Sequence, residues 1–275
     1  MKTEYLSDHV RAMLQETTNL HRRAVHDAVF ARTNVMAAAA RHGTAQRTKP
    51  IWRRALSVPS ADETEALGEF AQARGLYQTS LEAYGDLDVR LAQLSAGAAG
   101  EETLVRALAA SLTDQWLLLH GYLSRRGEAD VVVVGPAGVW VIEVKNLRVR
   151  LSVRGETWRY DKLDSAGNVV ESGDATDGSG RSWGRQAADV ATALTPWLRA
   201  HDVAASVRTA VVLVREGASI QDLENPCVDV VTADMAKLLH EIKKRAGNDL
   251  GLDEITRIAD LVRQDHQAHN TAVDG

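Results

Sequence analysis

Residues 127–146, with the sequence GEADVVVVGPAGVWVIEVKN, decide the fold of this chain. Two apolar runs, Asp130–Val134 and Val139–Lys145, flank the turn-forming sequence Gly-Pro-Ala-Gly. Valine and isoleucine favour strands, whereas glycine and proline favour tight turns. The segment is therefore predicted to be a β-hairpin with little contact with water.

The pairing of this hairpin follows from its loop. If Val134 and Val139 flank a four-residue loop, stepping back along the two strands places Asp130 opposite Glu143. Opposed residues share a face of the sheet, with Cβ atoms roughly 4.5–5.5 Å apart. Lys145 lies two residues after Glu143 and projects on that face too. A regular hairpin, without a bulge, therefore gathers two carboxylates and an ammonium group.

This trio predicts chemistry on phosphate esters. Two carboxylates this close repel each other, and a divalent cation removes the conflict. Mg²⁺ prefers one or two carboxylates together with phosphate oxygens and water, and it can activate water for phosphoryl displacement. Lys145 would then hold the water or neutralise charge in the transition state. The alternative is that Asp130, Glu143 and Lys145 are weakly paired charges facing solvent at a strand end.

Two further polar residues occupy positions where an apolar residue is expected. Glu101 falls on the helical stripe of Val105, Leu108 and Leu112, and Gln186 precedes Val190 and Leu194 at helical spacing. Glu102 flanks the first stripe and is the weaker candidate. The simpler interpretations are an acid favoured in a first helical turn by the helix dipole, and a glutamine at the edge of the core.

The same residues resemble a known family. Asp130 followed by Glu143-Val-Lys145 is similar to the D…E-x-K signature of PD-(D/E)xK, restriction-endonuclease-like nucleases. More narrowly, Gly100-Glu101, the hairpin up to Asn146 and Gln186, in this order, resemble the nuclease-related domain (NERD) family over roughly residues 97–235. The chain departs from the family after the motif, where Leu147-Arg-Val-Arg-Leu replaces a glycine or tryptophan.

The resemblance implies phosphodiester hydrolysis with Mg²⁺, for which Mn²⁺ can substitute. Asp130, Glu143, the backbone carbonyl of Val144 and Glu101 would be metal ligands. Lys145 would position water or phosphate, with Glu101 and Gln186 as supporting residues. The implied partner is nucleic acid, with DNA as the expected polymer. A non-catalytic nucleic-acid-binding or assembly module on the same fold is the alternative.

The resemblance also implies an α/β fold with a restriction-endonuclease-like mixed sheet flanked by helices, over residues 96–275. The sequence predicts a helix over 101–120, strands over 147–153 and 157–160, and a polar loop over 168–182. A helix over 183–201, kinked or restarted at Pro196, and strands over 206–214 and 228–231 follow. Helices over 233–244 and 252–267 complete the domain.

Residues 1–95 are expected to form an α-helical extension, either a helical hairpin or a coiled coil. A helix over 1–48 is followed by a linker over 49–59, a helix over 63–94 and a flexible boundary over 95–100. Residues 1–60 carry ten basic and four acidic residues, and residues 61–95 carry two and seven. The second helix has an apolar stripe made of Leu67, Phe70, Tyr77, Leu81, Tyr84, Leu91 and Leu94.

Three roles remain open for this extension. The basic helix could simply pack on the acidic one. It could also bind nucleic acid through its basic side chains, with Trp52 stacking on a base. Residues 63–94 could instead bind a second copy of the chain or another protein partner.

Composition limits the class of protein. Of 275 residues, 45% are apolar and 25% are charged, as in ordinary globular proteins, and the net charge of −5 argues against a protein that coats nucleic acid. The one cysteine, Cys227, excludes an internal disulfide. Because the sequence has no apolar run of membrane-spanning length and no signal-peptide pattern at its start, we expect a cytoplasmic protein without a membrane partner.

Overall fold

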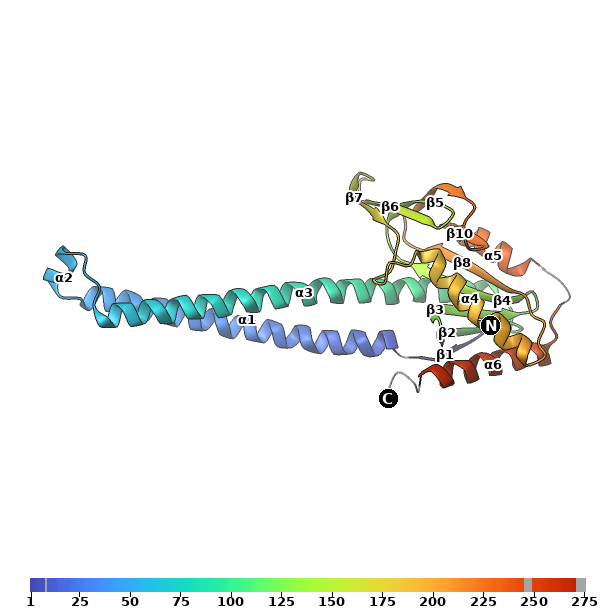
Figure 1. The fold of residues 1–275 in the computed structure, drawn as a ribbon, viewed down its shortest axis with the longest axis horizontal. Coiled ribbons are helices and arrows are strands. Elements are labelled where there is room, and N and C mark those ends of the chain that lie inside the picture. The colour runs from blue at the N-terminus through green and yellow to red at the C-terminus, as the bar shows by residue number, and fades with distance from the viewer. Residues whose placement is uncertain (8, 245–248, 271–275) are drawn as a thin grey trace. The chain divides into compact units, whose positions relative to one another are not determined.

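A computed structural model describes residues 1–7, 9–244 and 249–270 (Figure 1). The chain divides into two compact units. One unit is Arg11–Ser95, and the other combines Met1–Val10 with Ala96–Gly275.

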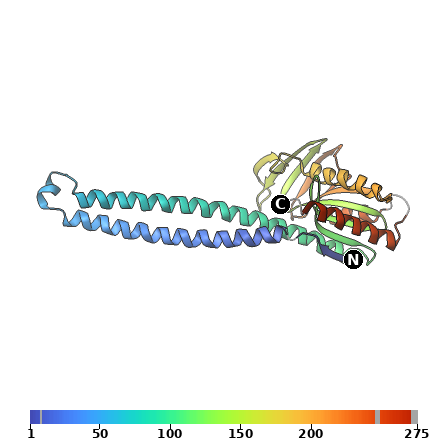
Figure 2. The ribbon, with the colours of Figure 1, turned by 60° about the horizontal axis from the view of Figure 1, so that its bottom comes forward.

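The Arg11–Ser95 unit is an antiparallel pair of long helices joined by a short one (Figure 2). The helices are α1 (His9–Thr48), α2 (Ile51–Ala55) and α3 (Ala61–Ser111). Ion pairs join α1 to α3, with Arg41 Nε 2.8 Å from Glu69 Oε2 and His21 Nε2 3.3 Å from Asp88 Oδ1. The short helix α2 lies within the segment that was expected to be a linker.

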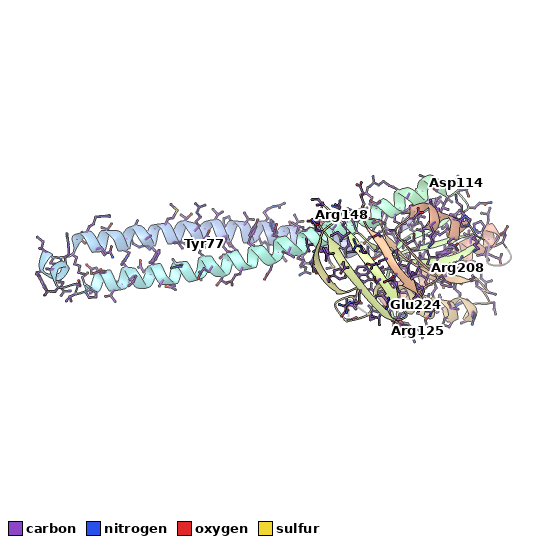
Figure 3. All side chains as sticks on the ribbon, turned by 90° about the horizontal axis from the view of Figure 1, so that it is seen from above. Tyr77, Asp114, Arg125, Arg148, Arg208 and Glu224 are labelled. Atoms are coloured by element: carbon purple, nitrogen blue, oxygen red, sulfur yellow. The ribbon has the colours of Figure 1, made fainter. Side chains whose placement is uncertain are left out.

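Small residues of α1 and larger residues of α3 line the seam of this hairpin. The buried residues of α1 include Ala24, Ala28, Ala31 and Ala38, which recur in steps of three, four or seven. On α3 the matching half-buried positions are Phe70, Tyr77, Tyr84, Leu87 and Leu91 (Figure 3 labels Tyr77). This spacing is the heptad pattern of a coiled coil. Leu67 and Leu81, expected on the buried stripe, are instead exposed.

Three predictions about the helical segments were wrong. The helix α3 continues through residues 95–100, because the three alanines there offset the helix-weakening glycines. It ends at Ser111 rather than near His120, and the strand β2 (Leu117–Ser124) follows. Residues 2–5 are not helical but form the strand β1 (Lys2–Tyr5), which pairs with β2 in parallel.

The second unit is built on a mixed sheet flanked by helices, as predicted. The sheet has six strands in the order β1-β2-β3-β4-β8-β10. Its other strands are β3 (Gly127–Gly135), β4 (Gly138–Lys145), β8 (Val207–Leu213) and β10 (Val230–Thr232). Strand β4 is antiparallel to β3 and parallel to β8. The predicted register is confirmed, since Val134 pairs with Val139 and Val131 with Ile142.

Helices cover both faces of this sheet (Figure 1). Val132, Val139 and Val141 share a buried core with α4 (Trp183–Ala200) and α6 (Leu252–Asn270). The opposite face packs on the end of α3 and on α5 (Met235–Lys243). Pro196 lies inside α4, which continues through it. The sheet is thus buried on both sides, which explains the nearly continuous apolar sequence of its central strands.

A second, four-stranded sheet has the order β7-β6-β5-β9. Its strands are β5 (Val149–Arg154), β6 (Thr157–Leu163), β7 (Val169–Asp174) and β9 (Ser219–Glu224). Strand β7 occupies part of the predicted loop over 168–182, and β9 was not predicted. Both strands are mostly exposed edge strands, so they lack the apolar alternation that identifies a half-buried strand. No helix in the described part of the chain is long and apolar enough to cross a membrane.

Candidate active site

The predicted trio lies at the end of the β3–β4 hairpin that is far from its turn, where Asp130 is half-buried. Asp130 shares a face of β3 with Val132 and Val134, and Glu143 and Lys145 share the corresponding face of β4 with Val139 and Val141. Because β4 is a central strand between β3 and β8, Glu143 is only 4% exposed. Lys145 ends the strand, and its side chain is 20% exposed.

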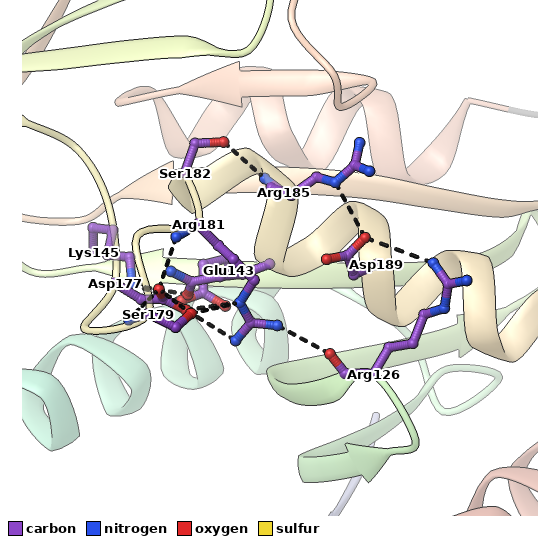
Figure 4. Close-up of polar contacts among 10 residues, drawn as sticks. Arg126, Glu143, Lys145, Asp177, Ser179, Arg181, Ser182, Arg185 and Asp189 are labelled. Carbon is purple, nitrogen blue, oxygen red and sulfur yellow. Dashed lines mark hydrogen bonds and ion pairs between the residues drawn. The ribbon is translucent and has the colours of Figure 1, made fainter.

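Two short hydrogen bonds fix these side chains. Lys145 Nζ donates to Glu143 Oε1 at 2.6 Å (Figure 4), and the Val144 backbone N–H donates to Asp130 Oδ2 at 2.6 Å. The carboxylate of Asp130 therefore takes the place of a backbone acceptor from β3. Because the N–H and C=O of a strand residue point toward the same neighbouring strand, the Val144 carbonyl faces β3 as well.

Burial and neighbouring negative charges raise the pKa of both acids. Burial raises the pKa of Asp130 well above its ordinary value of 3.8, and the charge of Glu143 adds to this more than Lys145 opposes it. Burial also raises the pKa of Glu143, although Lys145 works in the other direction. For Lys145, burial would lower the pKa, but the two carboxylates outweigh it and raise the pKa. Lys145 is therefore protonated at neutral pH.

The helix α4 brings Gln186 to the same place. Ser182 caps the start of this helix by accepting a hydrogen bond from the Arg185 N–H at 3.2 Å, which directs the first turn toward Lys145. Gln186 is 8% exposed, and its Oε1 lies 3.5 Å from Lys145 Nζ. Its Nε2 is buried and has no hydrogen-bond partner among the described residues. This leaves a donor available at the site.

Glu101 approaches the site from α3 and has a partner that the sequence did not indicate. Its Oε2 lies 2.7 Å from Nε2 of His120 on β2, and Glu101 is 8% exposed. The charge of Glu101 raises the pKa of both Asp130 and Glu143. His120 was missed because the helix before it was expected to extend to this residue. The weaker candidate Glu102 is 67% exposed and lies near Arg106 instead.

The loop before α4 adds a charge that sequence reasoning also missed. Burial would raise the pKa of Asp177, but hydrogen bonds from Ser179 and Arg181 lower it to about 2. The resulting negative charge contributes to the raised pKa of Lys145. Arg181 also donates to the backbone carbonyl of Arg126 at 3.0 Å, which ties this loop to the turn between β2 and β3 (Figure 4). In the sequence, the one sign that this loop could place a charge near the site was its polar composition.

The residues present suit a hard divalent cation. In the described ranges, no three His, Cys, Asp or Glu side chains are gathered in a group that could hold a metal ion. The donors would instead be two carboxylates and the Val144 carbonyl, all oxygen atoms of the kind that Mg²⁺ prefers. The raised pKa values of Asp130 and Glu143 express a repulsion that such a cation would relieve.

The comparison with protein families agrees with this geometry. Residues 96–214 match the family model described as the nuclease-related domain, NERD. No curated protein and no solved structure matched the chain. The matched segment contains Glu101, Asp130, Glu143, Lys145 and Gln186. Residues 96–214 are therefore similar to the nuclease-related domain, whose general context is the PD-(D/E)xK nucleases.

Proposed function

We propose that this chain is a metal-dependent nuclease that hydrolyses phosphodiester bonds of nucleic acid, with DNA as the expected polymer. One observation carries the proposal. Two carboxylates with raised pKa values, those of the half-buried Asp130 and the buried Glu143, share one face of the sheet with a protonated lysine. A structural ion pair needs only one carboxylate, so the second one leaves a repulsion that serves no purpose in folding.

Asp130, Glu143 and the Val144 carbonyl would hold Mg²⁺, or Mn²⁺ in its place. The bound ion would neutralise the carboxylates and act as a Lewis acid toward a phosphate oxygen. Glu101, oriented by His120, would be a further oxygen ligand or would hold a water molecule.

Lys145 and Gln186 would position the attacking water and the phosphate oxygens. The ammonium of Lys145 donates hydrogen bonds to the attacking water or to a phosphate oxygen, and its charge opposes the negative charge that grows in the transition state. Gln186 Oε1 orients this ammonium, and its free Nε2 can donate to a substrate oxygen. The water oxygen forms a bond to phosphorus as the bond from phosphorus to the leaving oxygen breaks; the water gives up a proton to solvent, and the leaving oxygen takes one up.

The test is cleavage by the full chain of labelled single- and double-stranded DNA and RNA, with Mg²⁺, Mn²⁺ or EDTA. We expect cleavage only with a divalent cation. Glu143→Gln should abolish it, whereas the control Glu102→Gln should retain it, because Glu102 is exposed and pairs with Arg106. Unchanged activity of Glu143→Gln would refute the assignment. Substrate binding without cleavage under all conditions would favour the non-catalytic module instead.

A further inference from the structure

The turn between α1 and α3 exposes large apolar side chains. Ile51 is 82% exposed, Leu56 68%, Trp52 58% and Val58 43%. The short helix α2, which carries Ile51 and Trp52, has no buried residue. We call these four side chains, together with the basic residues of 47–60, the tip surface. Single exposed apolar residues are ordinary, but four within eight residues form a patch that is typical of an interaction site.

The same segment is strongly basic. Residues 47–60 contain four basic residues and no acidic one, and no Asp or Glu occurs from residue 28 to residue 61. One of the four, Lys49, is 10% exposed and pairs with Glu63 at 2.8 Å, which leaves Arg47, Arg53 and Arg54 as the basic side chains of the surface. Two of the guanidinium groups bond to neutral carbonyl oxygens, Arg53 to that of Pro59 and Arg54 to that of Lys49. These contacts orient the arginines without neutralising them.

We propose that the tip surface docks on an anionic lipid surface. Apolar side chains that include a tryptophan, flanked by arginines, are the combination that enters the headgroup region of a bilayer while basic groups contact lipid phosphates. The proposal is independent of the nuclease assignment. It departs from the expectation that the chain has no membrane partner, since contact by a tip needs no membrane-spanning helix.

Two other partners fit the tip surface less well. Nucleic acid would use the arginines and Trp52, but it offers no apolar surface for Ile51, Leu56 and Val58. A second copy of the tip would satisfy the apolar side chains but would bring together two sets of three arginines. A lipid surface with anionic headgroups satisfies both features at once.

Vesicle flotation of the full chain tests this proposal. We expect at least about tenfold stronger binding to vesicles of phosphatidylcholine with phosphatidylglycerol than to phosphatidylcholine alone, and weaker binding in high salt. Ile51→Ser combined with Leu56→Ser should reduce binding at least about tenfold. The matched control is Val29→Ser combined with Met36→Ser, because these α1 residues are 61% and 64% exposed but lie away from the tip. It should bind like the unaltered chain.

Tryptophan fluorescence gives a second measurement. Trp52 is the one exposed tryptophan in the described residues, so lipids brominated near the headgroup should quench its emission, and Trp52→Phe should remove that quenching without preventing flotation. Circular dichroism of each variant checks that the helices remain folded. Equal binding to both vesicle types, or equal loss in the control pair, would overturn the proposal. Loss of DNA binding in the tip variants, with no vesicle binding by the unaltered chain, would identify a nucleic-acid surface instead.

Discussion

Replacing Asp130 with asparagine should stabilise the metal-free protein at neutral pH. The pKa of Asp130 is raised by burial and by Glu143, so the folded chain binds more protons than the unfolded chain above about pH 4. The free energy of unfolding therefore falls as the pH rises through the raised pKa. Asparagine stays neutral throughout, and its oxygen can still accept the hydrogen bond from the Val144 N–H that Asp130 accepts at 2.6 Å.

The size of the effect follows from the opposed carboxylates. Two unit charges about 5 Å apart, with an effective dielectric constant of about 20, repel each other by about 3 kcal/mol. Lys145, at 2.6 Å from Glu143, offsets part of this repulsion. We expect Asp130→Asn to raise the free energy of unfolding by about 1–2 kcal/mol at pH 7, equivalent to about 2–8 °C in Tm.

Urea unfolding between pH 5 and pH 8 in EDTA, followed by tryptophan fluorescence, measures this difference. Four buried tryptophans report on the unit that carries the site: Trp116, Trp140, Trp158 and Trp183. The advantage of the asparagine variant should grow with pH. Mg²⁺ at a hundred times its Kd should stabilise the unaltered chain by about 2.7 kcal/mol and the variant by much less.

The control for this experiment is Asp222→Asn. Asp222 has a 46% exposed side chain that pairs with Arg154 across a solvent-accessible strand edge, so its loss should change stability by no more than about 0.5 kcal/mol. A variant Asp130→Asn that is less stable than the unaltered chain throughout, or a difference that does not vary with pH, would refute the reasoning.

Further substitutions test Lys145, the Glu101–His120 pair and the packing at the start of α4. Lys145→Met should lower cleavage by about 10²–10³-fold but retain Mg²⁺ binding in calorimetry, and loss of ion binding would contradict its assigned role. His120→Asn should weaken Mg²⁺ binding by about tenfold or more because it releases Glu101; unchanged calorimetry would place this pair outside the site. Gly184→Ala should lower the free energy of unfolding by about 1–3 kcal/mol, because the added Cβ would lie 2.3 Å from the Trp158 ring, whereas Gly178→Ala meets nothing within 4 Å.

The hairpin could be predicted from sequence because its information is local. Both strands lie within residues 127–146, a short turn joins them, and the apolar runs fix the pairing. Since side chains alternate along a strand, the register alone puts Asp130, Glu143 and Lys145 on one face. Nothing distant in the chain is needed for that inference, and the observed register agrees with it.

Strand β1 could not be predicted in the same way. Its residues, Lys-Thr-Glu-Tyr, are all exposed and have no apolar pattern, and they become a strand by pairing with β2, more than a hundred residues later. The misassignment of β2 had a related cause. Leu112, Trp116 and Leu119 recur at helical spacing, whereas Leu118 and Leu119 are both fully buried on opposite faces of the sheet. A strand buried on both faces loses the alternation that distinguishes it from a helix.

In the α1–α3 pair, the large apolar residues of α1 do not mark the buried surface. In α1 the large residues Val29, Phe30 and Met36 are exposed, and alanines form the buried seam. Alanine at these positions leaves room for the aromatic side chains of α3, so the heptad period is visible only when small residues are counted as core. The same principle, that departures from a pattern carry information, applies to the candidate site. Glu143 and Gln186 replace apolar residues in elements that are otherwise buried, which is the local inconsistency expected where function opposes stability.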